Sequence, residues 1–339
     1  MKSIRELSLT ELEDWLKEHN QPKFRARQIQ DWLFKKFIVS FDEMANVPKA
    51  LREELQKEFL PIGVSPVETH RADDGTVKWL SELSDGNKIE TVLIRAPERN
   101  TVCISSQVGC AVRCVFCESG RHGFVRNLTT VEIIEEVILA SHECGKLVDN
   151  IVVMGTGEPM HNLDNLIPAL EFICDQETGL GLGARHITVS TSGVPNGIRR
   201  LADQQKPWNL ALSLHAATDE LRAQIIPDHH RSDLDDILLA CKEYREATGR
   251  MLTFEYALVK DLNDSDKDAF NLAHLAHKYR AKVNLIPLNK GAAKLEAPSP
   301  ETCRAFLDTL TSRGVQATIR LKKGDKIKAA CGQLTIKKK

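Results

Sequence analysis

The chain has 339 residues, enough for one large domain and an accessory unit, and its 42% hydrophobic content can fill a core without disulfide staples. Its nine cysteines are odd in number and unevenly placed, and it shows no signal peptide and no apolar run long enough to span a bilayer, so we expect a cytoplasmic protein without a membrane partner. The chain has 46 Lys and Arg against 47 Asp and Glu, so its net charge cannot attract a nucleic acid. Any nucleic-acid partner would have to be held by a local basic patch.

The first sixty or so residues have the pattern of a small helical unit. Apolar residues recur at helical spacing over Leu9–Glu18 and Lys23–Phe37, and a third helix is expected at Lys49–Phe59, after Pro48. The basic residues of this unit could grip phosphates or form an ordinary solvated face, and the pattern leaves both open; they are Lys23, Arg25, Arg27, Lys35 and Lys36. We expect a helical accessory domain over residues 1–62.

A short strand-rich region follows. The segments Thr76–Leu83 and Lys88–Arg95 alternate apolar and polar residues, and Asp85-Gly86 between them is typical turn chemistry. This predicts a β-hairpin within a linker region over residues 63–100.

From Thr101 onward, strand and helix patterns alternate, which is typical of parallel βαβ units. Thr129 and Glu132 form the capping box of the clearest helix. The expected strands are TVCISS from 101, NIVVMG from 150, HITVST from 186, NLALSL from 209, LTFEYAL from 252, KVNLIP from 282 and VQATIRL from 315. We therefore expect an α/β fold with an open (β/α)6 barrel-like sheet over residues 101–339.

Three cysteines follow the first of these strands in the run CAVRCVFC, at Cys110, Cys114 and Cys117. Structural zinc closes its coordination with four ligands, whereas this loop offers three thiolates and no nearby fourth ligand. One loop could hold three corners of a [4Fe-4S] cluster and leave the fourth iron open to a small molecule. The spacing, with Phe116, resembles the signature of radical S-adenosylmethionine (SAM) enzymes; a zinc knuckle with a distant ligand and disulfide pairing are the alternatives.

Polar residues come after several of the other strands, and the carboxyl ends of parallel strands share one edge of a sheet. Gly157 and Glu158 lie in a GTGEP turn, where the carboxylate could receive an ammonium group. Hydroxyl and amide groups at Ser190, Ser213 and Asn289 could bond ribose hydroxyls or a carboxylate. His215 is by itself more typical of a satisfied structural histidine.

The sequence as a whole resembles the RlmN/Cfr family of radical SAM RNA methyltransferases. The segments that carry the resemblance are CISSQVGCAVRCVFCESGRHGFVRNLTTVEII, MGTGEP, TVSTSG, LSLHA, NLIPLN and IKAACGQL, with PKFRARQIQDWLF and SFDEMANVPKALR in the accessory unit. It implies a radical SAM partial barrel that binds a [4Fe-4S] cluster and two SAM molecules per turnover. The implied SAM ligands are Gly157, Glu158, Ser190, Ser213, Leu214, His215 and Asn289. Thr156 and Lys328 depart from the family pattern.

The chemistry implied by this resemblance needs two further cysteines. Carbons 2 and 8 of adenine are not nucleophilic toward an ordinary methyl donor, so a radical route is required. Cys331 would accept a methyl group from one SAM, and the adenosyl radical from a second SAM would remove a hydrogen from it. After the carbon adds to adenine, Cys103 would attack the sulfur of Cys331 and release the RNA, leaving a disulfide for thiol exchange to reduce. Glu90 matches the family's proposed proton acceptor.

Without the resemblance, these three residues have ordinary interpretations: Cys103 as a small core residue, Cys331 as an exposed thiol and Glu90 as a solvent-facing strand residue. Basic residues near Cys331 should favour its thiolate and could hold RNA phosphate; they are Arg320, Lys322, Lys323, Lys326 and Lys328. Four cysteines lie in helical patterns and are expected to be inert, namely Cys144, Cys174, Cys241 and Cys303. His229-His230 is expected to be a loop pair.

The resemblance implies methylation of carbon 2 of an adenosine in 23S ribosomal RNA, and also in transfer RNA next to the anticodon. The run GFVRNLTTVEII favours carbon 2 over carbon 8, the position that Cfr methylates. The alternatives are this carbon 8 activity and a non-catalytic RNA-binding protein with a structural metal loop. The expected partners are these RNAs and an electron donor such as flavodoxin or ferredoxin.

Overall fold

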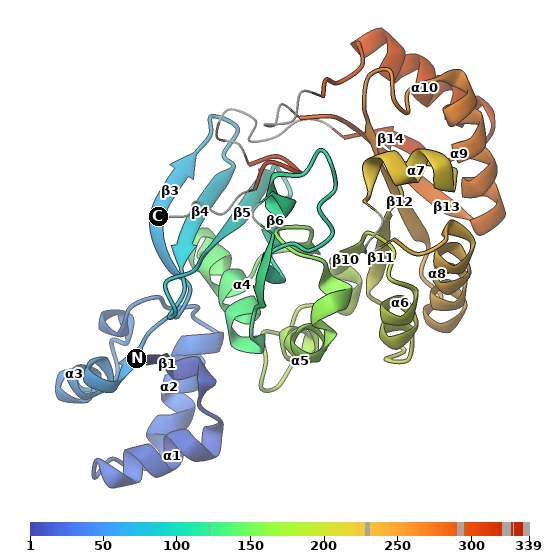
Figure 1. The fold of residues 1–339 in the computed structure, drawn as a ribbon. Coiled ribbons are helices and arrows are strands. Elements are labelled where there is room, and N and C mark those ends of the chain that lie inside the picture. Colours follow the sequence, from blue (N-terminus) through green and yellow to red (C-terminus); the bar gives the residue numbers. More distant parts are fainter. Residues whose placement is uncertain (122, 228–230, 290–294, 321–326, 328, 335–339) are drawn as a thin grey trace.

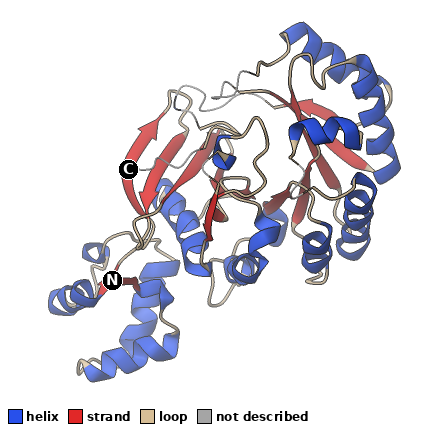
Figure 2. Cartoon of the chain, in the orientation of Figure 1, coloured by secondary structure: helices blue, strands red, loops and turns tan. Residues whose placement is uncertain are grey.

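The computed structural model describes residues 1–121, 123–227, 231–289, 295–320, 327 and 329–334. Within this part of the chain, ten strands form one mixed sheet in the order β14-β13-β12-β11-β10-β9-β6-β5-β4-β3. Figure 1 shows this sheet as a curved, open wall with helices on its outer side, and Figure 2 separates the two kinds of element by colour. The fold is the expected open barrel-like α/β sheet with a helical N-terminal unit.

The N-terminal unit contains the three expected helices, α1 (Leu9–Glu18), α2 (Phe24–Phe34) and α3 (Lys49–Glu58). Two-residue strands β1 (Lys2–Ser3) and β2 (Phe59–Leu60) pair in parallel beside them. A buried ion pair between Arg5 and Glu135 of α4 (Thr130–Cys144) joins this unit to the sheet domain. Glu135 also accepts hydrogen bonds from the backbone N–H groups of Gly63 and Val64, at 2.7 and 3.0 Å. Figure 1 shows the unit projecting from one end of the sheet.

Three antiparallel strands come next, β3 (Ser65–Arg71), β4 (Val77–Glu82) and β5 (Lys88–Ala96). The expected hairpin is β4–β5. It continues directly into the main sheet, because β5 also pairs antiparallel with β6 (Arg99–Ile104), with Val92 opposite Cys103. The region between the helical unit and the parallel strands therefore extends the wall of the sheet domain.

All seven strand patterns from residue 101 onward form strands, and each pairs in parallel with its neighbour. After β6 they are β9 (Asn150–Val153), β10 (Ile187–Thr191), β11 (Asn209–Ser213), β12 (Leu252–Leu258), β13 (Ala281–Pro287) and β14 (Ala317–Ile319). The helices between them are α4 (Thr130–Cys144), α5 (Leu163–Cys174), α6 (Pro195–Ala202), α7 (Asp219–Ile225), α8 (Leu234–Thr248), α9 (Asp266–Tyr279) and α10 (Pro300–Ser312). The predicted capping box of Thr129 and Glu132 starts α4.

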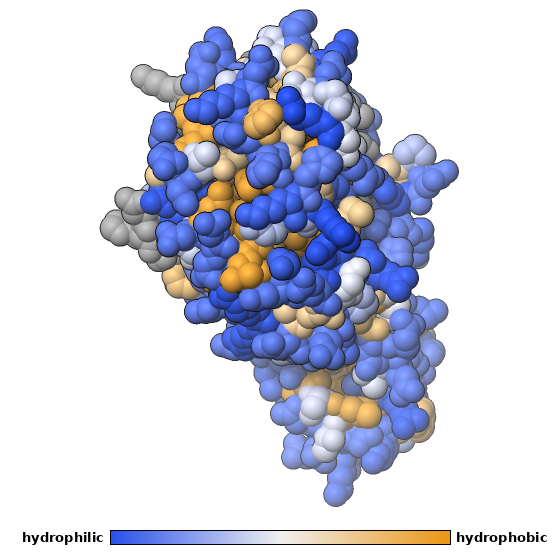
Figure 3. All heavy atoms as spheres, turned by 90° about the vertical axis from the view of Figure 1, so that its right-hand side faces the viewer, coloured by the Kyte–Doolittle hydropathy of each residue, from blue (hydrophilic) through white to orange (hydrophobic). Residues whose placement is uncertain are grey.

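The main hydrophobic core runs between the sheet and these outer helices and continues into the N-terminal unit. Hydrophilic side chains cover most of the face in Figure 3, where hydrophobic ones gather in an area of the upper body, above the narrower lower lobe. In the described residues, no helix is both long and apolar enough to cross a bilayer.

Candidate active site

A short antiparallel hairpin holds the cysteine loop beyond the carboxyl end of β6. Strand β7 (Gln107–Gly109) pairs with β8 (Phe124–Asn127), and the loop with the three cysteines runs between them. Gly109 has φ +77°, and a Cβ atom there would lie 1.9 Å from the carbonyl oxygen of Gly123. The hairpin therefore closes only with glycine at this position.

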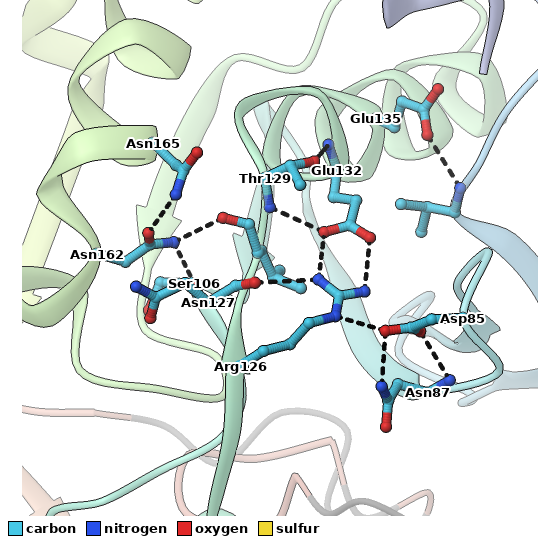
Figure 4. Close-up of polar contacts among 12 residues, drawn as sticks. Asp85, Asn87, Ser106, Arg126, Asn127, Thr129, Glu132, Glu135, Asn162 and Asn165 are labelled. Carbon is cyan, nitrogen blue, oxygen red and sulfur yellow. Dashed lines mark hydrogen bonds and ion pairs between the residues drawn. The ribbon is translucent and has the colours of Figure 1, made fainter. Parts of the chain in front are cut away.

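Arg126 on β8 ties this hairpin to two other parts of the sheet domain (Figure 4). Its Nε donates to Asp85 at 2.6 Å, and its two Nη atoms donate to the Glu132 carboxylate at 2.8 Å each. Glu132 is the capping-box residue of α4, and Asp85 lies in the β4–β5 turn. The motif residues Arg126, Thr129 and Glu132 thus fix the base of the cysteine loop.

Replacing Arg126 with leucine should lower the free energy of unfolding by about 1–3 kcal/mol, because charged hydrogen bonds to two carboxylates are lost. The guanidinium holds the pKa of Asp85 at about 2, so the stabilisation is present above the ordinary pKa of 3.8 and is lost as the pH falls through 2. Thermal unfolding at neutral pH checks the first point. The control is Arg200→Leu, whose pair with Asp164 is 51% and 82% exposed and should cost under about 0.5 kcal/mol. Equal melting temperatures for the two variants would contradict the assignment.

The three loop cysteines line one cavity together with residues from the ends of five parallel strands. Burial raises the pKa of Cys110 to about 12 and also raises the pKa of Cys114 and Cys117, and the thiols repel one another's charges. The predicted residues that line the cavity are Cys110, Cys114, Cys117, Gly157, Glu158, Ser190, Ser213, His215, Asn289 and Cys331.

This donor set fits a [4Fe-4S] cluster. Within the described residues, no group of three His, Cys, Asp or Glu side chains is arranged to hold a metal ion. A cubane places each thiolate on a different iron, so it requires three sulfurs around one space, not three that converge on a point. Cys110, Cys114 and Cys117 meet this requirement, and a cationic cluster would offset the cost of burying three thiolates together.

Glu158 is buried, and the protein already contacts both of its carboxylate oxygens. Oε1 accepts from the Thr191 hydroxyl at 2.7 Å, and Oε2 accepts from the backbone N–H of Ser192 at 2.7 Å. The carboxylate is thereby oriented toward the cavity with acceptor capacity left for a cation. Gly157 has φ +114°, and a Cβ there would lie 2.6 Å from the Ser106 hydroxyl, so the close approach that requires glycine is to the protein's own chain.

His215 is a neutral, oriented ring. Its Nδ1 accepts the backbone N–H of Ala257 at 3.0 Å, and burial, with the charge of Arg222, lowers its pKa to about 3. Nε2 therefore carries the proton. Phe116 of the cysteine loop packs edge-on against the ring, with centroids 4.9 Å apart. The neighbouring Leu214 is fully buried in the main core and does not line the cavity, unlike the other predicted SAM ligands.

The C-terminal loop with Cys331 docks on the cysteine loop. The backbone N–H of Glu118 donates to the carbonyl of Gly332 at 2.9 Å, and the Ser119 hydroxyl donates to that of Leu334 at 2.8 Å. Asn289 holds the loop from β13, because its Nδ2 donates to the carbonyl of Cys331 at 3.0 Å. These contacts place Cys331 at the cavity although it lies more than 200 residues from the three loop cysteines.

Cys103 is buried on β6 and lines a second, smaller cavity that Cys331 also lines. Burial, with the charge of Cys331, raises the pKa of Cys103 well above its ordinary value. No disulfide joins these two cysteines, or any of the other seven, in the structure. The structure thus brings both lone cysteines of the sequence analysis to one place.

Glu90 lies on the same face of the sheet as Cys103. Glu90 is two residues from Val92 on β5, so both side chains are on one face. Val92 pairs with Cys103 of β6 and with Lys78 of β4. Lys78 forms a 2.8 Å ion pair with Glu90, and the two side chains are 7% and 5% exposed. Glu90 lines neither of the two cavities.

Sequence reasoning missed three buried residues of this region: Lys78, Glu255 and Arg222. The signal for Lys78 was its place on the same alternating face of the hairpin as Glu90, whereas Glu255 looked like an ordinary position in a strand. Among the basic residues expected around Cys331, only Arg320 is described. His229-His230 and the lysines at 322, 323, 326 and 328 lie outside the described residues. Thr156, which departs from the family pattern, is buried, and its hydroxyl lies 3.5 Å from the hydroxyl of Ser119.

Comparisons with known proteins cover nearly the whole chain. Residues 3–60 match the family model of the ribosomal RNA large subunit methyltransferase N-terminal domain, and residues 104–273 match that of the radical SAM superfamily. A probable dual-specificity RNA methyltransferase RlmN of Clostridium perfringens strain 13 is 43% identical over 98% of this chain and 96% of its own. One from Akkermansia muciniphila is 44% identical over 96% of this chain and 92% of its own.

Among solved structures, a radical SAM methyltransferase from Sphaerobacter thermophilus matches with a TM-score of 0.90 and 42% identity. The match covers 98% of this chain and 99% of that one. Enzymes of this superfamily use a [4Fe-4S] cluster and SAM, in agreement with the donor set of the cavity. The chain therefore belongs to the RlmN family of radical SAM RNA methyltransferases.

Proposed function

We propose that the enzyme methylates carbon 2 of an adenosine in 23S ribosomal RNA, and in transfer RNA next to the anticodon, through a methylcysteine at Cys331. One observation carries the proposal: Cys331 lines the cavity of the three cluster cysteines and also the adjoining cavity of Cys103. A thiol in that position can receive a methyl group on one side and be attacked by a second thiol on the other. The family resemblance of the run from Gly123 to Ile134 supports carbon 2.

In this proposal Cys110, Cys114 and Cys117 would hold the cluster, which when bound would supply the one-electron chemistry that adenine carbon 2 requires. Glu158 receives the ammonium group of SAM, and its bonds to Thr191 and Ser192 fix it for that task. The remaining residues proposed to bind SAM are Gly157, Ser190, Ser213, His215 and Asn289 at the cavity, with Leu214 contributing through its backbone position beside them.

The release of RNA falls to the second cavity. Glu90, which lies on the same face of the sheet as Cys103, accepts the proton that the adenine carbon loses, and its ion pair with Lys78 orients its carboxylate. The Cys103 thiolate attacks the sulfur of Cys331, the thioether bond breaks with its electron pair going to the RNA carbon, this carbon takes up a proton to complete the methyl group, and a Cys103–Cys331 disulfide remains. An external thiol then reduces this disulfide, which fits a reaction in the cytoplasm.

We propose that residues 1–62 bind the RNA, since their basic side chains include Arg27 and Lys36, which carry no carboxylate partner in the described contacts. The region from residue 101 carries the cluster loop and both reacting cysteines, and residues 63–100 connect it to the helical unit and contribute Glu90. The electron donor is a small redox protein of the flavodoxin or ferredoxin class. It can approach the cysteine loop, where Val115 and Phe124 are 42% and 47% exposed.

Purified enzyme given SAM with a trideuterated methyl group should place label on adenine carbon 2 of RNA. The product methyl should carry fewer than three deuterons, because one methyl hydrogen is lost and later replaced. Nucleoside mass spectrometry reads the label, and unmodified ribosomal and transfer RNA from a strain without this activity are assayed in parallel. An intact CD3 group would indicate direct transfer, and label at carbon 8 would assign the carbon 8 activity.

A further inference from the structure

Arg320 occupies the boundary between the two cavities. It follows β14, and its backbone N–H donates to the carbonyl of Leu285 on β13 at 2.8 Å, which anchors it at the carboxyl edge of the sheet. Its side chain lines the cavity of the cluster cysteines and also the smaller cavity of Cys103. Among the described basic residues, Arg320 alone lines both.

The guanidinium group points at sulfur. Nη1 of Arg320 lies 3.6 Å from Sγ of Cys331 and 3.9 Å from Sδ of Met154. A thiolate is a far better hydrogen-bond acceptor for a cation than a neutral thioether, so the contact with Cys331 is the stronger of the two once that thiol is ionised. This geometry places a permanent positive charge against a nucleophilic sulfur.

The other groups that face Arg320 are acidic. The pKa of Arg320 is raised above its ordinary value by the charge of Cys331, which has the largest effect, and also by the charges of Glu255 and Cys103. Glu255 is 4% exposed; its Oε1 accepts from Asn284 at 2.9 Å, while its Oε2 is buried and has no hydrogen-bond partner in the described residues. Arg320 is thus a cation among three acidic groups, and two of them are the lone cysteines of the proposed reaction.

We propose that Arg320 is a positioning residue for methyl transfer, holding Cys331 as a thiolate aimed into the cavity of the cluster cysteines. The inference rests on the proposed role of Cys331 as methyl acceptor. The thiol first loses its proton to water, which reaches it because Cys331 is exposed. Its sulfur lone pair then forms a bond to the methyl carbon as the carbon–sulfonium bond of SAM breaks, giving S-methylcysteine and S-adenosylhomocysteine. Arg320 stabilises the charged form that makes this attack, and it stays behind unchanged.

The test measures the thiolate directly. Full-length protein is reconstituted with iron and sulfide, and no SAM is added. Iodoacetamide, an uncharged reagent, alkylates Cys331 at a rate set by its thiolate fraction, which peptide mass spectrometry follows on unmethylated Cys331 at neutral pH. Arg320→Gln should slow this alkylation about tenfold, because the thiolate loses its charged hydrogen-bond donor, and Arg320→Lys should slow it less because the charge remains.

Two controls separate this effect from a loss of structure. Alkylation of Cys144, a half-buried thiol at the end of α4, should be the same in every variant. Arg250→Gln removes another half-buried arginine, bonded to Asn209 at 2.5 Å, and should leave alkylation of Cys331 unchanged. The difference between wild type and Arg320→Gln should also narrow at high salt, since Cys331 is exposed and its charge can be screened.

A second measurement, methylation of Cys331 by added SAM, links the thiolate to the reaction. Slower alkylation and slower methylation of Cys331 in Arg320→Gln, with partial rescue of both in Arg320→Lys, support the inference. Normal alkylation of Cys331 in Arg320→Gln overturns it, whether or not RNA is methylated. If wild-type protein never methylates Cys331 although Arg320→Gln slows its alkylation, the proposed function fails while the effect of Arg320 on the thiolate stands.

Discussion

Replacing Cys110, Cys114 or Cys117 with alanine should abolish SAM cleavage and RNA methylation, whereas the reconstituted wild-type protein should bind about four iron atoms. The three thiols line one cavity, and each is expected to hold one corner of the cluster. Each substitution would leave the cluster with two of its three protein ligands, so one further iron would have no protein ligand. We expect no detectable SAM cleavage or RNA methylation in any of the three variants.

Iron and sulfide content and the visible absorption of the cluster provide the measurement, with 5'-deoxyadenosine as the product of SAM cleavage. Cys144→Ala is the matched control, since that thiol lies on α4 outside the cavity and should retain full iron content. Tightly bound zinc without iron uptake would point instead to the structural zinc loop.

The parts of the fold that the sequence predicted are those with a local signal. The seven parallel strands alternate with helices in a regular order, and the helix after the cysteine loop begins at its capping box, Thr129 and Glu132. The cysteine spacing is equally local, because all three thiols belong to one loop of eight residues. Such features follow from short-range periodicity and turn chemistry, which are visible without the tertiary structure.

The contacts that the sequence could not predict depend on register and on long-range docking. The ion pair of Lys78 with Glu90 requires the register of β4 against β5, which a turn sequence alone does not fix. The contact of Arg320 with Cys331 requires the C-terminal loop to fold back onto the cavity, and no periodic pattern spans that stretch. The reason for Gly157 also lay in tertiary packing, since its neighbours Ser106 and Gln107 come from β6–β7.

Leu214 shows the limit of carrying a motif over residue by residue. The motif LSLHA places it between Ser213 and His215, both of which line the cavity. Leu214 follows the last residue of β11, where the chain turns at His215 with φ +56°, and its side chain is buried in the core. Any contact of Leu214 with SAM would therefore come from its backbone.

Cys103→Ala should trap a covalent complex of enzyme and RNA, and Cys331→Ala should form no such complex and no methylated RNA. The two thiols line one small cavity, so Cys103 can reach the sulfur of Cys331 without passing through solvent. Removing Cys103 leaves methyl transfer and addition to adenine intact but removes the nucleophile that breaks the thioether bond. Cys331→Ala removes the methyl carrier itself, so the reaction stops before RNA is joined.

Denaturing gel electrophoresis with labelled RNA measures the complex, and peptide mass spectrometry locates the linkage at Cys331. Cys303→Ala, at a buried thiol on α10, should turn over normally and show no trapped RNA. Burial raises the pKa of Cys103, so little of this thiol is ionised. In the wild-type enzyme the release step should therefore slow as the pH is lowered, because the thiolate is the attacking form. The amount of trapped complex in Cys103→Ala should not change over the same pH range. Normal turnover in both single variants would rule out the methylcysteine route, because no other described thiol lines the cavity of Cys103 and Cys331.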